Sequence, residues 1–327
     1  MRPGRRGSRP RSKLRPEHAD AADAMVIAVD RGRWTCVLDG LPARFVVAMR
    51  ARELGRTPIV VGDRVGVVGD LDAAARDSHT RETADTLARI VRVAERSSVL
   101  RRTADDTDPY ERIVVANAAR LVIVTALADP PPRQGLIDRC LVAAYAGGLT
   151  PMLCLTKADL APPDELLAQY ADLDTPAVVC RLGVPPSELR AALAGRLSAL
   201  VGHSGVGKST LVNALVPSAA RAVGVVSAIG RGRHTSSSVV ALPLPDGGWV
   251  VDTPGIRSFG LAHVRPDDVV TTFTDLAAAI EDCPRGCGHL GPPADPECAL
   301  DTLTGSAARR ARSVRRLLHA LTTPDHP

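Results

Sequence analysis

The segment VGHSGVGKST, residues 201–210, contains the pattern G-x-x-x-x-G-K-[ST]. Its glycines let consecutive backbone N–H groups curve around a phosphate at a helix N-terminus, where the helix dipole also favours negative charge. Lys208 is placed to reach the β- and γ-phosphates of a nucleotide, and Ser209 to ligate Mg²⁺. Apolar runs before and after the segment suit a strand and a helix. The pattern therefore predicts a nucleotide phosphate site.

A second motif, D-x-x-G, begins at Asp252 after the apolar run WVV. We expect its carboxylate on the metal side of the phosphates and the N–H of Gly255 at the γ-phosphate. Between the two motifs lies IGRGRHTSSS, residues 229–238, whose glycines, cations and hydroxyls suit a switch loop. Thr235 is our candidate for a further hydroxyl ligand of Mg²⁺. The alternative for this segment is an ordinary polar loop.

The tetrapeptide TKAD, residues 156–159, follows the apolar run PMLCL. Asp159 could accept hydrogen bonds from N1 and N2 of guanine, which adenine cannot supply, and Lys157 could lie along the face of the ring. Loops that follow buried strands are where α/β sheets bind ligands. The motif favours a guanine nucleotide, and a chance tetrapeptide is the alternative.

The order of these motifs along the chain is base loop, phosphate loop, switch and D-x-x-G, whereas a GTPase normally places the base loop last. Joining the ends of such a domain and cutting it elsewhere keeps every spatial neighbour, because domain termini often lie close together. The sequence thus predicts a circularly permuted domain. In that domain Asp159, Lys208 and Asp252 converge on one nucleotide.

The elements that would position these motifs form two patterns. From Tyr110 onwards, runs such as ARLVIVTAL are apolar throughout and alternate with helical segments such as GLIDRCLVAAYAGG. This alternation predicts a parallel sheet covered on both faces. Five short strand-like runs between Met25 and Leu100 instead predict a closed barrel such as an OB-fold. Barrels of this kind often bind single-stranded nucleic acid or structured RNA, so Trp34 and Phe45 could stack on bases. We favour a place in the barrel core for both.

Three of the seven cysteines fall in CPRGCGHLGPPADPEC, residues 283–298. With one histidine they form a Cys₃His set, which is the ligand number of a closed structural Zn²⁺ site. Its members are Cys283, Cys287, His289 and Cys298. Reduced thiols without a metal are the alternative. The other four cysteines stand singly in apolar surroundings, which indicates reduced core thiols and no disulfide framework.

The segment SAARRARSVRRLLHAL predicts an amphipathic helix. Its apolar face would consist of Ala307, Ala311, Val314, Leu318 and Leu321. Its arginines could bind RNA phosphates or simply face solvent; they are Arg309, Arg310, Arg312, Arg315 and Arg316.

The 327-residue chain has a net charge of +5, and its first 15 residues hold seven basic residues and no acid. This arm could contact RNA or act only as a solubilising tail. There is no run of about 18 apolar residues, so we expect no membrane span. The N-terminus lacks the apolar core of a signal peptide. We therefore expect a cytoplasmic protein.

Residues 25–321 resemble the ribosome small-subunit-dependent GTPases of the RsgA/YjeQ family, on the evidence of TKAD, GHSGVGKST, GRGRHT, DTPGIRSFG and the Cys/His segment. The composition, the strand pattern and this resemblance together predict a multidomain chain whose parts can be given by residue range. They are a basic disordered arm (1–24), an N-terminal OB-like β-barrel (25–100), a central α/β circularly permuted P-loop GTPase domain (101–262) and a small C-terminal α-helical zinc-binding extension (263–327).

The same resemblance implies a cytoplasmic GTPase that binds the small (30S) ribosomal subunit and its 16S rRNA. Such a protein acts in late maturation of the subunit and hydrolyses GTP to GDP, slowly alone and faster on the subunit. One structural Zn²⁺, and Mg²⁺ with GTP, are the implied cofactors. A monomer with no membrane or DNA partner is expected. Two alternatives stay open, an rRNA-binding module whose nucleotide state only times release, and an ATP-dependent kinase.

The implied contacts with GTP are Thr156, Lys157, Ala158, Asp159, Gly202, His203, Ser204, Gly205, Val206, Gly207, Lys208, Ser209, Thr210 and Gly255. Catalytic roles are implied for His234, Thr235 and Asp252. For His234, a solvent-exposed loop position or a contact with RNA is the alternative. The residue after D-x-x-G is Ile256, which cannot orient an attacking water, so we expect low intrinsic turnover.

This chain departs from the family pattern in two places. Thr156 stands where an Asn is common. The metal segment has three residues before Cys287 and eight after His289, where the family usually has four and five.

Overall fold

The computed structural model describes residues 18–40, 43–71, 87–103, 108, 110–217, 239–253 and 260–322. The switch segment with His234 and Thr235 lies outside these residues, as do Gly255, Ile256 and most of the basic arm. In the part of the chain that is described, no helix is long and apolar enough to cross a bilayer.

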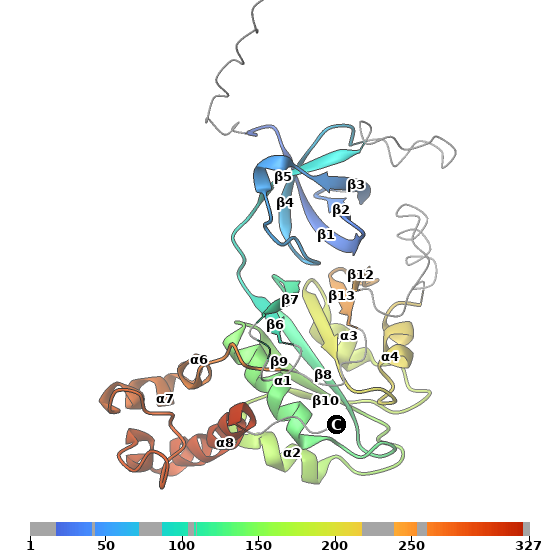
Figure 1. Cartoon of the computed structure of the whole chain (residues 1–327). Helices are drawn as coiled ribbons and strands as arrows, with labels where there is room; N and C mark the ends of the chain where they lie inside the picture. Colours follow the sequence, from blue (N-terminus) through green and yellow to red (C-terminus); the bar gives the residue numbers. More distant parts are fainter. Residues whose placement is uncertain are drawn as a thin grey trace, which may run out of the picture.

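The first strands close into a barrel, at the top of Figure 1. They are β1 (Ala22–Asp30), β2 (Arg33–Leu38), β3 (Arg44–Arg50), β4 (Arg64–Val68) and β5 (Ala88–Val93), with the short helix η1 (Arg52–Leu54) between β3 and β4. β1 pairs with both β2 and β4, β3 pairs with β2 and in parallel with β5, and the β4–β5 pair completes the ring. This confirms the predicted OB-like barrel.

The two aromatic residues of the barrel have different surroundings. Trp34 is 8% exposed, belongs to the core inside the barrel, and donates its indole N–H to the carbonyl of Ile59 at 3.0 Å. Phe45 is half-buried and packs instead against the apolar cluster that continues into the central domain. The predicted place in the barrel core is confirmed for Trp34. Phe45 is a barrel residue that packs where the barrel meets the central domain.

The central sheet has the strand order β10-β9-β8-β11-β13-β12. The strands are β8 (Arg120–Ala126), β9 (Thr150–Thr156), β10 (Ala177–Val179), β11 (Leu197–Val201), β12 (Val240–Pro243) and β13 (Trp249–Asp252). All adjacent pairs are parallel except β12–β13, which is the hairpin at one end of the order. A separate hairpin, β6 (Val99–Arg102) and β7 (Arg112–Ala116), lies between the barrel and this sheet (Figure 1).

Helices cover both faces of the central sheet, as the apolar runs predict. They are α1 (Gln134–Ala146), α2 (Asp164–Tyr170) with the 3-10 turn η3 (Ala171–Leu173), α3 (Ser187–Leu193) and α4 (Lys208–Leu215). On β8, Leu121 and Ile123 belong to the cluster that holds α1 and α2. Val122 and Val124 belong to the cluster that holds α3 and α4. Successive side chains of a strand point to opposite faces of the sheet, so β8 contributes residues to the apolar cores on both faces.

The C-terminal extension, coloured orange to red in Figure 1, is helical. It comprises α6 (Pro266–Val270), α7 (Thr274–Ala279), η4 (Ile280–Asp282), η5 (Ala299–Thr302) and α8 (Gly305–Thr322). The predicted apolar face of α8 is buried at Ala311, Val314 and Leu318. Leu317, which is not part of the predicted face, is buried as well.

The arginines of α8 mainly contact protein groups. Arg310 bonds to Asp174 and, at 2.9 Å, to Asp275, and Arg309 lies 3.2 Å from Asp172. Arg316 stacks over the ring of Tyr170 at 4.8 Å. Arg315 pairs with Asp301 at 2.7 Å, and Arg312 is exposed. Most of these arginines therefore hold α8 against α2 and η3 of the central domain and against α7 of the extension.

The barrel meets the central domain through close backbone contact at Gly62. Its φ is +90°, and a Cβ there would lie 1.9 Å from the carbonyl oxygen of Ala116. Asn117 donates its side-chain amide to the carbonyl of Gly62 at 3.0 Å and accepts the N–H of Ser97 at 2.9 Å. In addition, Ala28 of β1 pairs with Val240 of β12. Only glycine fits the closest point of this junction.

Replacing this glycine tests the junction. In Gly62→Ala, a positive φ alone lowers the free energy of unfolding by roughly 1–2 kcal/mol. The clash of the new Cβ with the carbonyl of Ala116 adds to this cost. Gly32→Ala is the matched control, because Gly32 has φ +80° and open space around its Cβ position. We expect Gly62→Ala to lower the thermal unfolding midpoint more than Gly32→Ala does. Equal shifts in differential scanning calorimetry would contradict the assigned contact.

Candidate nucleotide and metal sites

The three predicted nucleotide motifs follow strands that end at the same edge of the central sheet. β9 ends at Thr156, β11 at Val201 and β13 at Asp252. β8 is paired in parallel with β9 and β11, and β11 with β13. Carboxyl ends of parallel strands meet at one edge, where α/β sheets bind ligands.

The phosphate loop, residues 202–207, joins β11 to α4 in the predicted strand–loop–helix order. Gly202 packs so closely on β8 that a Cβ would lie 2.4 Å from the carbonyl oxygen of Val124. Gly205 and Gly207 have φ of +83° and +89°, in the left-handed region that glycine tolerates best. Ser204 and Gly205 are exposed, and α4 starts at Lys208. The loop can therefore turn its N–H groups towards an anion.

Lys208 and the D-x-x-G motif meet, although 44 residues separate Lys208 from Asp252. The Lys208 ammonium is buried and donates to the carboxylate of Asp252 and to the carbonyl of Thr253. The Thr253 hydroxyl in turn donates to the carbonyl of Leu200 at 2.6 Å. Ser209 follows Lys208 in the first turn of α4. Hydroxyl and carboxylate oxygens are ligands that Mg²⁺ prefers, so the residues present fit this ion.

The base loop is bonded directly to the phosphate loop. Thr156 is 6% exposed, and its hydroxyl oxygen lies 2.6 Å from the carbonyl oxygen of Val206 and 3.2 Å from that of Thr125. A threonine hydroxyl has one proton to donate, and the shorter contact identifies Val206 as the main acceptor. Thr156 thus ties together two loops that are 50 residues apart.

The rest of the base loop is fixed by backbone contacts. Lys157 adopts φ +57° and donates its ammonium to the carbonyl of Asp129. The N–H of Ala158 lies 3.3 Å from the carbonyl of Cys180, and Asp159 accepts the N–H of Leu182 at 3.2 Å. Cys180 and Leu182 make these contacts through their backbone carbonyl and N–H groups, so the identity of their side chains does not reveal them.

A cavity of about 800 Å³ opens beside the two loops. It is lined by Thr156, Lys157, Asp159, Gly207 and Thr210 from the predicted motifs, and by Leu160, Leu182, Val184 and Leu211, which were not predicted. Apolar walls with a carboxylate at one point suit a flat heterocycle that is read along one edge.

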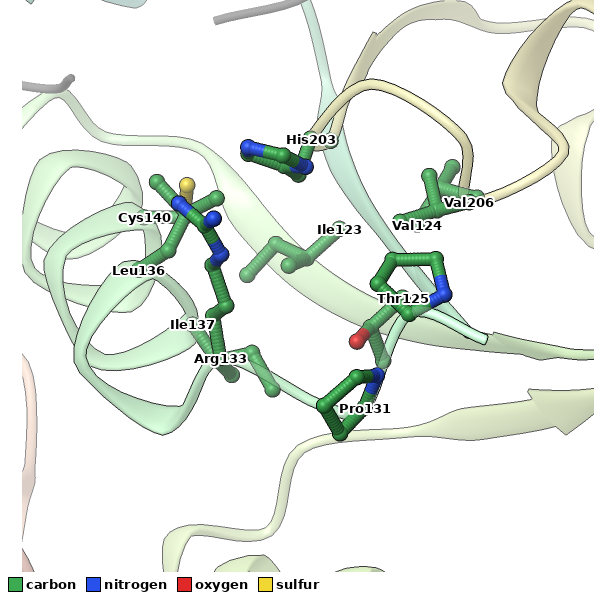
Figure 2. Close-up of a pocket in the computed structure, with 12 residues that line it drawn as sticks. Ile123, Val124, Thr125, Pro131, Arg133, Leu136, Ile137, Cys140, His203 and Val206 are labelled. Atoms are coloured by element: carbon green, nitrogen blue, oxygen red, sulfur yellow. The ribbon is translucent and has the colours of Figure 1, made fainter. Parts of the chain in front are cut away.

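A smaller cavity lies behind the phosphate loop. Figure 2 shows His203 and Val206 of the loop above Ile123 and Thr125 of β8, with Arg133 and Cys140 beside them. Its volume is about 10 Å³, which is room for roughly one water molecule. The imidazole Nδ1 of His203 lies 2.8 Å from the carbonyl of Ser204. His203 therefore lines the back of the loop and is absent from the lining of the large cavity.

The ligand atoms of the predicted Cys₃His set all lie within 4.8 Å of one another. Cys283 Sγ is 3.6 Å from Nδ1 of His289, so this nitrogen faces the thiols. The other ring nitrogen, Nε2, lies 2.8 Å from Oδ1 of Asp267. A carboxylate that bonds to the outer nitrogen of a ligating histidine fixes its tautomer and orientation.

Backbone N–H groups also point at the sulfur atoms. Ala299 donates to Cys283 Sγ at 3.3 Å, and His289 donates to Cys287 Sγ at 3.4 Å. The eight-residue spacer after His289 folds back, and Asp295 accepts N–H bonds from Gly288 at 3.0 Å and Leu290 at 2.9 Å. The donor set and its supporting bonds fit one Zn²⁺, which prefers four such ligands.

The Thr156 contact can be tested by removing its hydroxyl. Thr156→Val keeps the shape of the side chain and leaves the carbonyl of Val206 without its donor. We expect about tenfold weaker binding of guanine nucleotides, equivalent to about 1.4 kcal/mol. Thr156→Ser is the control that keeps the bond. Fluorescent GDP titration measures both variants, and unchanged affinity in Thr156→Val would show that the bond does not position the loops.

The carboxylate behind His289 gives a second test. Asp267→Ala should weaken zinc binding by roughly 10- to 100-fold, because the imidazole loses the partner that orients it. Glu281→Gln, at an exposed position of η4, is the control. Competition with a chromogenic chelator measures the affinity. Equal zinc affinity in the Asp267 variant and the control would exclude a supporting role.

Comparison with known proteins agrees with this geometry. The model of the RsgA GTPase family matches residues 93–262. The small ribosomal subunit biogenesis GTPase RsgA of Azotobacter vinelandii is 42% identical over 226 residues, which are 65% of each chain. The protein of that name from Gemmatimonas aurantiaca is 36% identical over 79% of this chain and 83% of its own.

Among solved structures, that of YloQ, described as a circularly permuted GTPase, superposes with a TM-score of 0.62 at 20% identity. The superposition covers 94% of this chain and 98% of that one, and it shows a shared fold. The alignment with the Azotobacter protein spans just under two thirds of that relative. On the family match, the chain belongs to the RsgA GTPase family.

Proposed function

We propose that this chain is a GTPase that binds the small (30S) ribosomal subunit and acts in its late maturation, hydrolysing GTP to GDP faster on the subunit than alone. The observation that carries the proposal is the convergence of Thr156, Val206, Lys208 and Asp252 at one edge of the sheet. The names of the family relatives supply the ribosomal part of it.

In the proposed complex the guanine base occupies the cavity of about 800 Å³, with Asp159 reading its N1 and N2 and Lys157 along its face. Asp159 already accepts one N–H from Leu182, so the backbone after β10 orients the carboxylate. Gly202–Thr210 wrap the phosphates. Lys208, now bonded to Asp252, is placed to turn to the β- and γ-phosphates when a nucleotide is present.

The magnesium ion would be held by Ser209 and Thr235 with Asp252 nearby, and when bound it would neutralise charge on the phosphates. Gly255 would donate its N–H to the γ-phosphate. His234 is proposed to assist the attacking water on the subunit, since Ile256 offers no polar group there. His234, Thr235 and Gly255 lie outside the described residues, so these roles come from the motifs alone.

Contacts with 16S rRNA are assigned to the barrel, residues 25–100, and to the basic arm, residues 1–24. The α8 arginines are less suited to this role, because Arg310 and Arg316 are engaged with Asp174 and Tyr170. One structural Zn²⁺ would hold the extension, residues 263–327, in shape. We propose a cytoplasmic monomer with no membrane or DNA partner.

Single-turnover hydrolysis of GTP, with and without purified small subunits, tests the proposal. The wild-type rate should rise more than about tenfold on the subunit, because His234 of this chain is proposed to assist the attacking water there. His234→Ala should bind GDP normally and lose most of the rise. Lys208→Ala should bind no nucleotide. Retained turnover in Lys208→Ala would reject the assigned phosphate loop.

The alternatives predict other outcomes, which require co-sedimentation with subunits and nucleotide competition beside the hydrolysis rate. If subunits leave the rate of GTP hydrolysis unchanged while GTP alters the affinity for the subunit, the chain is an rRNA-binding module whose nucleotide state only times its release. If ADP competes as well as GDP, the guanine assignment fails and a kinase becomes the better reading.

A further inference from the structure

Two cysteines that the predicted chemistry does not use lie together beside the base loop. Cys154 on β9 and Cys180, which directly follows β10, have their sulfur atoms 3.8 Å apart. The two strands are parallel neighbours. Cys154 is fully buried, whereas Cys180 is half-buried and lines the cavity of about 800 Å³. One thiol of the pair is thus accessible from the proposed nucleotide site.

The two thiols are unequal in acidity. The hydrogen bond with Cys154 lowers the pKa of Cys180. The same hydrogen bond and burial raise the pKa of Cys154. The thiolate is the reactive form of cysteine, so the accessible member of the pair is also the one with the larger thiolate fraction. Cys36, which is buried inside the barrel, has its pKa raised to about 12 by burial and lacks this activation.

We propose that Cys154 and Cys180 form an oxidation-sensitive dithiol, that peroxides convert it to a disulfide, and that this disulfide impairs nucleotide binding. The first part depends only on the two thiols. The consequence for nucleotide binding rests on the function proposed above.

The reaction balances with hydrogen peroxide as the oxidant. The Cys180 thiolate attacks one peroxide oxygen, the O–O bond breaks, and the leaving hydroxide takes up the thiol's proton as water, which gives a sulfenic acid. The sulfur of Cys154 then attacks the sulfur of Cys180. An S–S bond forms, the S–O bond breaks, and hydroxide leaves with the Cys154 proton as a second water. Two electrons pass from the thiols to one peroxide.

The disulfide would disturb the base loop through contacts on either side of Cys180. Closing 3.8 Å to a covalent bond of about 2 Å moves the sulfurs together by well over an ångström. The carbonyl of Cys180 accepts the N–H of Ala158 at 3.3 Å, and the N–H of Leu182 holds Asp159 at 3.2 Å. A displaced Cys180 therefore shifts the backbone that orients the carboxylate of Asp159.

Bond formation is tested on the full-length protein with hydrogen peroxide. Differential alkylation and peptide mass spectrometry should find a Cys154–Cys180 disulfide that dithiothreitol reverses. Cys154→Ala should give no such bond, and a sulfenic acid should be trapped at Cys180 in that variant. Cys140→Ala, which removes a buried thiol on α1, is the matched control and should form the disulfide as wild type does. Absence of the disulfide in wild type would overturn the proposal.

The consequence is tested by titrating fluorescent GDP into reduced, oxidised and re-reduced protein. We expect the oxidised form to bind about tenfold more weakly and the re-reduced form to regain its affinity. Zinc content is followed in parallel, so that oxidation of Cys283, Cys287 and Cys298 is recognised. A mapped disulfide with unchanged affinity would overturn the nucleotide part. Failure of the reduced protein to bind GDP would instead contradict the proposed function.

Discussion

A single hydroxyl group joins the two halves of the proposed nucleotide site. The bond from Thr156 to the carbonyl of Val206 fixes the distance between the loop that would read the base and the loop that would hold the phosphates. It forms because β9 and β11 flank β8 and run parallel to it, so their carboxyl ends reach the same edge. Sheet order decides this meeting, and chain order has no part in it. That is why a permuted chain keeps the site.

Much of this arrangement follows from local patterns in the sequence. Glycines at positive φ, a lysine at a helix start and strands that are apolar on both faces are all features of short segments. Residues 201–210 and the strands around them were accordingly predicted. The same holds for the cluster of Cys283, Cys287, His289 and Cys298, because a tight spacing of ligands leaves few other arrangements.

Contacts between side chains that are far apart in the sequence could not be predicted from such local patterns. Arg310 pairs with Asp174 across 136 residues, and neither residue belongs to a motif. Asp267, 22 residues before His289, looks like an ordinary acidic residue of a helix start. Phe45 is in β3, whose side chains alternate between two faces. The sequence of β3 does not reveal which of these faces meets the central domain. Partners of this kind are set by tertiary packing, which a local pattern does not encode.

The pairing of Ala28 with Val240 has a mechanical consequence for the whole molecule. β1 of the barrel bonds to β12, β12 bonds to β13, and β13 ends at Asp252. Neighbouring strands are about 4.8 Å apart, so two spacings, roughly 10 Å, separate the barrel from the strand that carries this carboxylate. Val240 pairs with both Ala28 and Asp252, so any movement of the barrel relative to the sheet has to strain or break the backbone pairing beside this carboxylate.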